Sequence, residues 1–475
     1  MPLDSSLLDA IRAVVGDKGL LTGADDIAPY LEEERGKYRG SADLVVRPAN
    51  TQQVAEVVKL AHEARVPLVP QGGNTGLCGG GVPAGGIVLS LARMKAVRAV
   101  DPINHTMTVE AGVILADVQA VAEEAGGLFP LSLGAEGSCQ IGGNLATNAG
   151  GTAVLRYGNT RDLVLGLEVV LADGRIWDGL TGLRKNNTGY DLKDLFVGSE
   201  GTLGIITAAV LKIFPKPAAR CTAMAAGPDV NAMMDLFARM MDRCGDVMSG
   251  FEFTERFGLS LACQHVDGCS DPFEGEHGAY ALIELTSPNP KAAEGLQERL
   301  EDVLGEAFEA EMIEDAVIAA NESQADALWH IRESIPEAQK HEGGSIKHDI
   351  SVPVSSVAEF MKRAAPLVEN CIPGVRICAF GHMGDGNIHY NLTQPAEADR
   401  EAFLGQWEEV NQVVHDLVHE MKGSFSAEHG VGKLKTSDMN RYKSAVELDL
   451  MARVKQALDP EGLLNPGKVI NLAED

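Results

Sequence analysis

Two histidines in the last quarter of the chain, His382 and His389, flank a short glycine-rich turn and could bind a metal ion together. The segments 375–380 and 388–392 are strand-like, and the Asp-Gly dipeptide at 385–386 is typical of a two-residue type I′ turn. Pairing outward from that turn places the two histidines directly opposite each other, with Cβ atoms about 5 Å apart. The pattern therefore predicts either a shared metal site or a hairpin with two hydrogen-bonded histidines.

A third metal ligand is predicted at Glu428, which lies next to His429 in the glycine-flanked segment 426–433. Asn391 follows His389 by two residues and therefore projects from the same face of its strand. Two histidines and one glutamate leave coordination positions open for a substrate, as catalytic metal sites do.

The composition indicates an enzyme with more than one domain. The chain has 475 residues, 45% of them hydrophobic and 52 of them glycine, and about 100 to 200 residues per domain predicts two or three domains. A formal net charge of −28 argues against nucleic acid and anionic membrane surfaces as partners. The eight cysteines form no CxxC pair, which argues against zinc ribbons and iron–sulfur clusters. Because no signal-peptide pattern or long apolar run is present, we expect a cytoplasmic protein without a transmembrane segment.

The helix and strand patterns change character near Lys216. Before it, a helix over 51–65 with a threonine N-cap lies in a βαβ unit, and glycine loops at 70–83 and 130–151 could cradle an anionic, flat cofactor or be ordinary turns. After it, helices and strands predict an α+β domain on an antiparallel sheet. No GxGxxG motif joins a strand to a helix, which argues against a Rossmann domain. Periodicity also predicts helices over 5–15, 29–34, 115–124, 315–332 and 402–421 and a strand over 345–352.

Seven motifs, taken in order, resemble those of one family. They lie at 70–83, 130–151, 185–192, 198–204, 381–391, 427–433 and 458–469. Together they resemble the FAD-linked 2-hydroxyacid dehydrogenases of the vanillyl-alcohol-oxidase flavoprotein family, nearest to those acting on D-2-hydroxyglutarate and D-lactate. The resemblance implies an α+β fold with a two-subdomain FAD-binding domain at 1–217. It also implies an α+β substrate (cap) domain with an antiparallel sheet at 218–425, and a segment at 426–475 that packs back on the FAD domain.

The same resemblance assigns residues to FAD. Because the first glycine loop has no histidine between positions 71 and 77, it implies non-covalent FAD. The matching residues are Pro70, Gly72, Gly73, Asn74, Thr75, Gly76, Leu77, Pro130, Leu133, Gly134, Gly143, Asn144, Thr147, Gly150 and Gly151, with Gly204 and Ile206 near the adenine.

The resemblance also implies a divalent metal ion on His382, His389 and Glu428, in agreement with the hairpin pattern. Zn²⁺ suits this ligand set, with Mn²⁺ and Co²⁺ as alternatives. His429 is then the predicted base that removes the proton of the substrate hydroxyl. Its alternative role is to stabilise the loop.

Substrate recognition is predicted at Arg332 and Lys347, with Asn391 also facing the substrate. The two cations resemble residues that hold the distal carboxylate of D-2-hydroxyglutarate, through a bidentate guanidinium contact, and surface cations are the alternative. Pro336 stands where related enzymes can offer a hydroxyl, so D-lactate and D-malate remain alternative substrates. An alcohol or aldonolactone oxidase, and a flavoprotein that only binds, are the competing functions.

The electron acceptor is expected to be a separate carrier, since no iron–sulfur or haem motif is present. An electron-transfer flavoprotein, a quinone or a cytochrome would fit. The resemblance suggests a homodimer.

Overall fold

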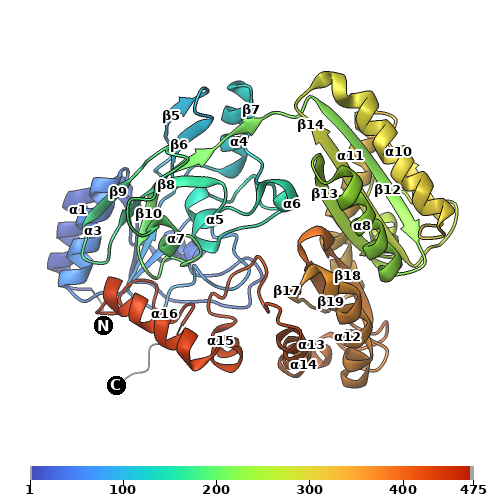
Figure 1. The fold of residues 1–475 in the computed structure, drawn as a ribbon. Coiled ribbons are helices and arrows are strands. Elements are labelled where there is room, and N and C mark those ends of the chain that lie inside the picture. Colours follow the sequence, from blue (N-terminus) through green and yellow to red (C-terminus); the bar gives the residue numbers. More distant parts are fainter. Residues whose placement is uncertain (1–2, 471–475) are drawn as a thin grey trace. The chain divides into compact units, whose positions relative to one another are not determined.

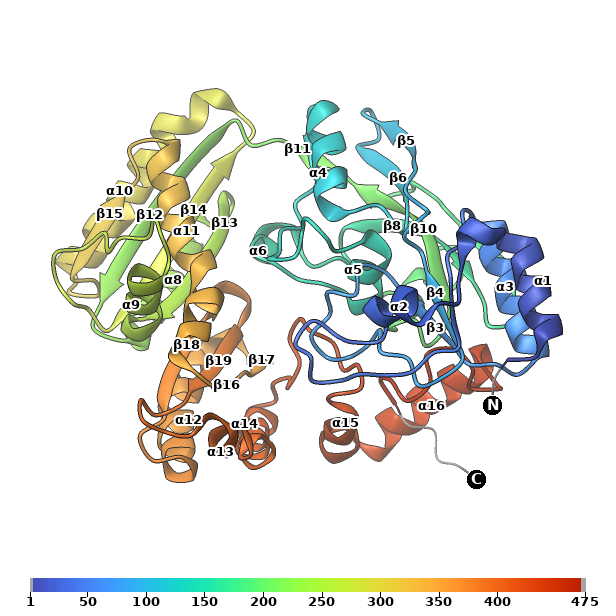
Figure 2. The same cartoon turned by 180° about the vertical axis from the view of Figure 1, so that it is seen from behind.

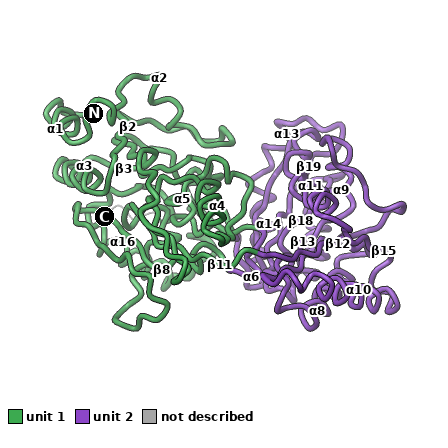
Figure 3. The backbone as a smooth tube through the Cα atoms, turned by 90° about the horizontal axis from the view of Figure 1, so that it is seen from above, with its two compact units in different colours: residues 1–151, 158–216, 428–475 green, residues 152–157, 217–427 purple. Residues whose placement is uncertain are grey.

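The computed structural model describes residues 3–470 and divides the chain into two compact units, shown in two colours in Figure 3. Unit 1 consists of the chain up to Gly151, Gly158–Lys216 and the segment from Glu428 onward, and unit 2 consists of Thr152–Tyr157 and Pro217–Ala427. The C-terminal segment therefore belongs to the same unit as the N-terminal part of the chain.

Unit 1 contains a mostly parallel sheet and an antiparallel sheet (Figure 1). The first has the order β1 (Leu20–Leu21), β2 (Leu44–Val46), β4 (Ile87–Ser90), β3 (Leu68–Gln71). The second has the order β5 (Val97–Asp101), β6 (Thr106–Glu110), β10 (Ile205–Lys212), β8 (Val164–Val170), β9 (Ile176–Gly179), and β7 (Gly127–Leu128) pairs with β11 (Phe214–Pro215). The helices are α1 (Ser5–Val15), α2 (Ala24–Ile27), α3 (Thr51–Glu63), α4 (Leu115–Glu124), α5 (Ile141–Thr147), α7 (Lys193–Phe196), α15 (Thr436–Tyr442) and α16 (Ala445–Leu458).

Helix α3 shows why the predicted βαβ unit forms. Its buried face carries Val54, Val57, Val58 and Ala61, the spacing of an amphipathic helix that packs on a sheet. The predicted threonine cap is wrong by one residue, because the side chain of Asn50 accepts the hydrogen bond from the Gln53 amide.

The C-terminal segment pairs with the parallel sheet of unit 1. The Leu68 amide donates to the Leu463 carbonyl at 2.9 Å, and the Asn465 amide donates to the Leu68 carbonyl at 2.8 Å. These bonds hold the end of the chain beside strand β3.

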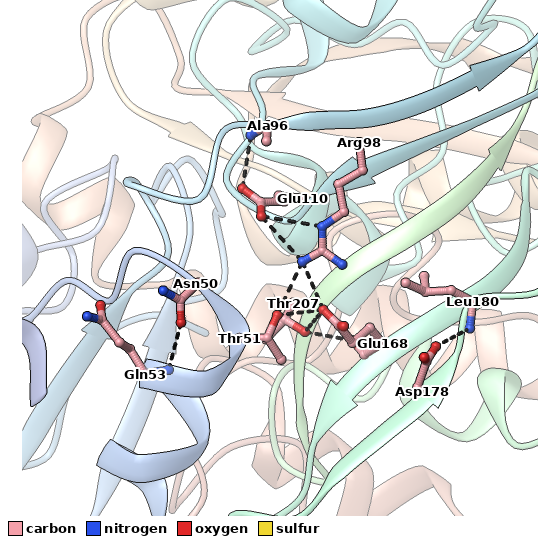
Figure 4. Close-up of polar contacts among 10 residues, drawn as sticks. All are labelled: Asn50, Thr51, Gln53, Ala96, Arg98, Glu110, Glu168, Asp178, Leu180 and Thr207. Carbon is pink, nitrogen blue, oxygen red and sulfur yellow. Dashed lines mark hydrogen bonds and ion pairs between the residues drawn. The ribbon is translucent and has the colours of Figure 1, made fainter.

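A charged network connects α3 to the antiparallel sheet of unit 1 (Figure 4). The Nη2 atom of Arg98 lies 3.0 Å from Oε1 of Glu168 and 3.3 Å from Oε1 of Glu110. The hydroxyls of Thr51 and Thr207 donate to the same Glu168 oxygen at 2.5 and 2.9 Å. Burial raises the pKa of Glu168, but Arg98 and the two hydroxyls outweigh it, so the pKa lies below its usual range.

Substituting Arg98 with alanine is expected to lower the free energy of unfolding by about 2 kcal/mol at neutral pH, because two largely buried carboxylates lose their cation. The part of the penalty that comes from Glu168 should shrink as the pH falls and be lost below the depressed pKa of Glu168 in the wild type, because the carboxylate is then protonated with or without Arg98. Urea denaturation at several pH values measures this penalty. Arg175, whose pair with Asp173 is exposed, is the control and should cost under ~0.5 kcal/mol. An equally small effect at Arg98 would contradict the prediction.

Unit 2 is built on an eight-stranded sheet in which every pairing is antiparallel. Its order is β15 (Asp315–Ile318), β12 (Ala219–Gly227), β14 (Ala279–Ser287), β13 (Met248–Glu255), β18 (Arg376–His382), β19 (Asn387–Thr393), β16 (Ser345–Ile346), with β17 (Asp349–Ser351) also on β19. The helices are α6 (Val154–Tyr157), α8 (Val230–Cys244), α9 (Arg256–His265), α10 (Ala293–Glu309), α11 (Glu322–Ala338), α12 (Val357–Cys371), α13 (Arg400–Leu404) and α14 (Trp407–Glu420).

Helices cover both faces of this sheet. One apolar core joins the sheet to α8, α10, α12 and α14 (Figure 1), and a second joins it to α9 and α11 on the opposite face (Figure 2). Side chains alternate between the two cores along β13, where Phe251 and Phe253 enter the first core. Glu252 between them therefore faces α11.

Several predicted elements are wrong in extent. The helix expected over 29–34 is instead α2 followed by a 3-10 turn at Ala28–Tyr30. The start of the helix expected over 315–332 is strand β15, which pairs with β12, and α11 begins later because Asn321 caps it. The strand expected over 345–352 is split into β16 and β17, and the helix expected over 402–421 is split into α13 and α14.

Candidate active site

The hairpin that carries the two histidines forms, but its predicted register is wrong. His382 lies opposite Asn387, and His389 lies opposite Phe380. The cause is the connection, in which residues 383–385 make a 3-10 turn before Gly386 adopts a φ of +82°, so the turn has more than two residues.

The two imidazoles nevertheless come together on one face of the sheet. Because Asn387 and His389 are two residues apart on β19, His389 is the diagonal neighbour of His382. Their ring centroids are 5.6 Å apart. The predicted pairing of imidazoles is therefore present through a diagonal contact, and both rings can approach one metal ion.

A buried carboxylate that the sequence analysis did not identify lies behind His382. Glu252 is paired with His382 across β13 and β18, and its Oε1 lies 2.7 Å from Nδ1 of His382. Its Oε2 accepts a hydrogen bond from Nε of Arg332 at 2.9 Å and forms an ion pair with Nη2 of Arg332 at 2.8 Å. Burial raises the pKa of Glu252, but His382 and Arg332 outweigh it and hold that pKa below its usual range. Glu252 is therefore an anion with a partner on each oxygen.

Arg332 is buried, with 7% of its surface exposed, so it is not a surface cation. Its guanidinium carbon lies 5.0 Å from the centroid of Phe380, on the histidine face of the sheet. Glu252 already occupies two of the three guanidinium nitrogens. The predicted bidentate contact with a substrate carboxylate stays a prediction, because Nη1 and the second N–H of Nη2 are not engaged by Glu252.

Lys347 lies between β16 and β17 and belongs to the same region of unit 2. Burial raises the pKa of the Cys378 thiol to about 12, and the charges of both Lys347 and Arg332 oppose that rise. The two cations therefore both lie near this thiol. Asn391 is buried, and its amide donates to the side chain of Gln339 at 3.0 Å.

Glu428 opens the last segment of unit 1, and the residue before it is held by unit 2. The amide of Ala427 donates to the carbonyl of Asp349 on β17 at 3.2 Å. His429 follows Glu428 directly. Ala427, the last residue of unit 2, is therefore attached to strand β17, which pairs with β19 of the histidine hairpin.

The loop after His429 is fixed by a second carboxylate that the sequence analysis did not identify, Glu200. Its side chain accepts hydrogen bonds from the amides of Val431 and Gly432 at 2.7 and 2.8 Å. Gly430 has a φ of +75°, which favours glycine, and a Cβ there would lie 2.7 Å from this carboxylate. Burial raises the pKa of Glu200 above its usual range despite these amides.

The first predicted FAD loop has the features of an anion-binding nest. The amides of Gly73, Asn74, Thr75, Gly76 and Leu77 donate to no residue of the described chain. Asn74 has a φ of +56°. Consecutive amides with such a backbone bind phosphate groups, so the loop fits the pyrophosphate of FAD.

The second predicted FAD tract lies beside the first. A Cβ on Gly73 would lie 2.3 Å from the Ser138 carbonyl, so the two loops are in contact. In the described chain, Oε1 of Gln140 and Oδ1 of Asn144 are buried without a hydrogen-bond partner, whereas a Cβ on Gly143 would meet nothing within 4 Å. Unsatisfied polar atoms beside open space fit a bound flavin.

The other predicted FAD residues have mixed surroundings. Gly76 and Gly134 border open space, whereas a Cβ on Gly204 would lie 2.7 Å from Val169. Thr147 donates to the Gly143 carbonyl at 3.0 Å. The remainder are buried or partly buried in unit 1, namely Pro70, Gly72, Pro130, Leu133, Gly150, Gly151 and Ile206.

Comparison with known proteins gives two family matches and close relatives. Residues 42–179 match the FAD binding domain, and residues 216–469 match the C-terminal domain of FAD linked oxidases. The chain is 37% identical to a probable mitochondrial D-2-hydroxyglutarate dehydrogenase of Oryza sativa subsp. japonica and 39% identical to a mitochondrial D-2-hydroxyglutarate dehydrogenase of Bos taurus. These alignments cover 98% of this chain and 82% and 83% of the relatives. A Saccharomyces cerevisiae protein named D-2-hydroxyglutarate–pyruvate transhydrogenase is 35% identical, over 98% of this chain and 95% of its own.

Solved structures with the same fold have low sequence identity. A substrate-bound p-cresol methylhydroxylase superposes with a TM-score of 0.76 at 18% identity, covering 99% of this chain and 97% of the other. The 4-ethylphenol oxidase from Gulosibacter chungangensis gives 0.73 at 17% identity, covering 98% and 96%. Among residues 3–470, no helix is long and apolar enough to span a membrane.

Proposed function

We infer that this chain, which belongs to the family of FAD-linked 2-hydroxyacid dehydrogenases, oxidises a D-2-hydroxy acid to the corresponding 2-oxo acid. The observation that carries the proposal is the single face of unit 2 that presents His382, His389 and Arg332. Imidazoles suit a metal ion that holds the hydroxyl end of a substrate, and a guanidinium suits a distant carboxylate.

The cofactors are assigned to the residues that fit them. When bound, FAD accepts a hydride and a divalent metal ion lowers the pKa of a coordinated hydroxyl. The loops at 70–77 and 130–151 hold FAD without a covalent bond. His382, His389 and Glu428 hold the metal ion, and Zn²⁺ suits that ligand set.

His429 takes the proton of the substrate hydroxyl as a general base. It follows the proposed ligand Glu428, and two backbone amides of the loop after it donate hydrogen bonds to the Glu200 carboxylate. A base on a fixed loop loses little conformational freedom when it acts, which favours general-base catalysis.

The reaction class is tested by anaerobic bleaching of the oxidised flavin. D-2-hydroxyglutarate is expected to bleach the yellow absorption faster than D-lactate, D-malate or an alcohol. Bleaching by alcohols or aldonolactones alone would instead favour an oxidase of the same fold. Bleaching by no compound of the panel would favour a flavoprotein that only binds.

Arg332 and Lys347 are proposed to hold the distal carboxylate, so D-2-hydroxyglutarate should exceed D-lactate in kcat/KM by at least about tenfold, or 1.4 kcal/mol. Arg332→Ala should erase that preference and lower kcat/KM much less for D-lactate than for D-2-hydroxyglutarate, because D-lactate has no distal carboxylate. Steady-state kinetics with an artificial acceptor measures both substrates.

D-lactate is the internal control for damage to the fold in this experiment. Equal losses for both substrates would place Arg332 on the carboxylate that the two share. A wild-type preference for D-lactate would contradict the dicarboxylate assignment.

The electron acceptor is proposed to be a separate carrier, namely an electron-transfer flavoprotein, a quinone or a cytochrome. A 2-oxo acid such as pyruvate is an alternative, because the yeast relative is named a transhydrogenase with pyruvate. The rate at which each candidate reoxidises the substrate-reduced enzyme distinguishes them. A homodimer is also proposed, and sedimentation measures it.

The compartment is proposed to be the cytoplasm, as predicted from the sequence. The plant and bovine relatives are named mitochondrial, so the mitochondrion is the alternative. Cell fractionation with an antibody to the chain decides between them.

A further inference from the structure

We propose that Glu252 is a positioning residue that orients both ends of the substrate pocket, one through His382 and the other through Arg332. The inference rests on the proposed function of those two residues. Glu252 touches neither substrate nor cofactor in this assignment. It acts through the two side chains that do.

The contact with His382 fixes which ring nitrogen can bind a metal ion. With Oε1 of Glu252 at 2.7 Å, Nδ1 of His382 is the nitrogen that carries a proton. Nε2 is then the nitrogen with the lone pair. A carboxylate behind a metal-bound histidine holds the ring orientation and raises its basicity, and its loss typically weakens metal binding 10- to 100-fold.

The contact with Arg332 fixes the direction of the guanidinium group. Oε2 of Glu252 accepts from Nε and forms an ion pair with Nη2, and the guanidinium carbon lies 5.0 Å from the ring centroid of Phe380. Within residues 3–470, Nη1 donates no hydrogen bond. A carboxylate of the substrate would therefore meet Arg332 at its terminal nitrogens, on the side away from Glu252.

The sheet explains how one carboxylate serves both partners. Glu252 and His382 are directly opposite each other on β13 and β18, and both project toward α11, which carries Arg332. The negative charge of Glu252 also compensates the positive charge of Arg332. The net positive charge that binds a dicarboxylate would then come from Lys347. Arg332 would fix the direction of the contact with the carboxylate.

The test compares Glu252→Gln with Glu255→Gln in the full-length holoenzyme. The side chain of glutamine has one oxygen that can accept, whereas glutamate has two, so the variant cannot accept from both His382 and Arg332 in this way. Glu252→Gln should therefore bind Zn²⁺ about 10- to 100-fold more weakly in competition with a chelator. At saturating Zn²⁺, its kcat/KM should fall at least about threefold more for D-2-hydroxyglutarate than for D-lactate. Glu255 is a partly buried glutamate on the same strand but on the opposite face, so Glu255→Gln should change neither quantity.

The outcomes separate this inference from the proposed function. If wild type binds no divalent metal and no hydroxy acid bleaches its flavin, the proposed function fails. If wild type does both, and Glu252→Gln keeps wild-type Zn²⁺ affinity and substrate preference, the positioning role is overturned.

A measurement on the unaltered protein covers the case in which Glu252→Gln does not fold. A crystal structure of the Zn²⁺-loaded wild type should show His382 on the metal through Nε2, with Nδ1 on Glu252. Coordination through Nδ1 would overturn the inference.

Discussion

Replacing His429 with alanine is expected to lower the rate of flavin reduction by about 10²- to 10⁴-fold, the usual contribution of a general base. FAD and metal content should stay at wild-type levels, because the proposed ligands of both are other residues. Stopped-flow absorbance under anaerobic conditions gives the rate. Flavin absorbance and elemental analysis give the two contents.

His419 is the matched control for this substitution, since it is an exposed histidine near the end of α14. Its alanine variant should reduce flavin at the wild-type rate. A rate for His429→Ala within about tenfold of wild type, ~1.4 kcal/mol, would assign His429 the alternative role of stabilising the loop.

The fold class and the family resemblance predicted from the sequence are confirmed by the family matches and the solved structures. Local patterns were sufficient for α1 and α4, whose bounds agree with the prediction, because each has a regular apolar face and ends at a glycine or alanine turn. The family resemblance depended on the order of the motifs, since no single glycine loop is specific to one family.

The hairpin shows where local pattern fails. The Asp-Gly dipeptide at 385–386 fits a two-residue turn, yet the chain makes a 3-10 turn first and Asp385 accepts from the amide of Asn387. The Asn387 side chain donates to Asp349 and to the Ile350 carbonyl. Strand β17, far away in the sequence, thus helps to set the register, and propensity at the turn does not contain that information.

Glu252 and Glu200 were not predicted because their partners are remote in the sequence. Glu252 depends on the adjacency of β13 and β18, and Glu200 depends on the return of the chain after Gly430. One sequence signal could have identified the first. A lone glutamate between Phe251 and Phe253 in a buried strand must be paired, because burying an unpaired carboxylate is costly.

The second large expected effect is the loss of metal and activity when a proposed metal ligand is removed. Substituting either His382 or His389 with alanine is expected to lower Zn²⁺ content to background after gel filtration and to reduce turnover to that of chelator-treated wild type. Losing one of three protein ligands removes most of the binding free energy of an open site. FAD content should remain unchanged, because the loops that fit FAD belong to unit 1 and the histidines to unit 2.

His277 is the matched control, since it is a histidine of unit 2 that pairs with Glu314 instead. Its alanine variant should keep metal and turnover. Adding Zn²⁺ to chelator-treated wild type should restore activity, whereas the same addition to His389→Ala should not, because the variant lacks the ligand and not the ion. Full metal content in both single variants, or undiminished turnover by metal-free wild type, would show that the two imidazoles pack in the sheet without binding a catalytic ion.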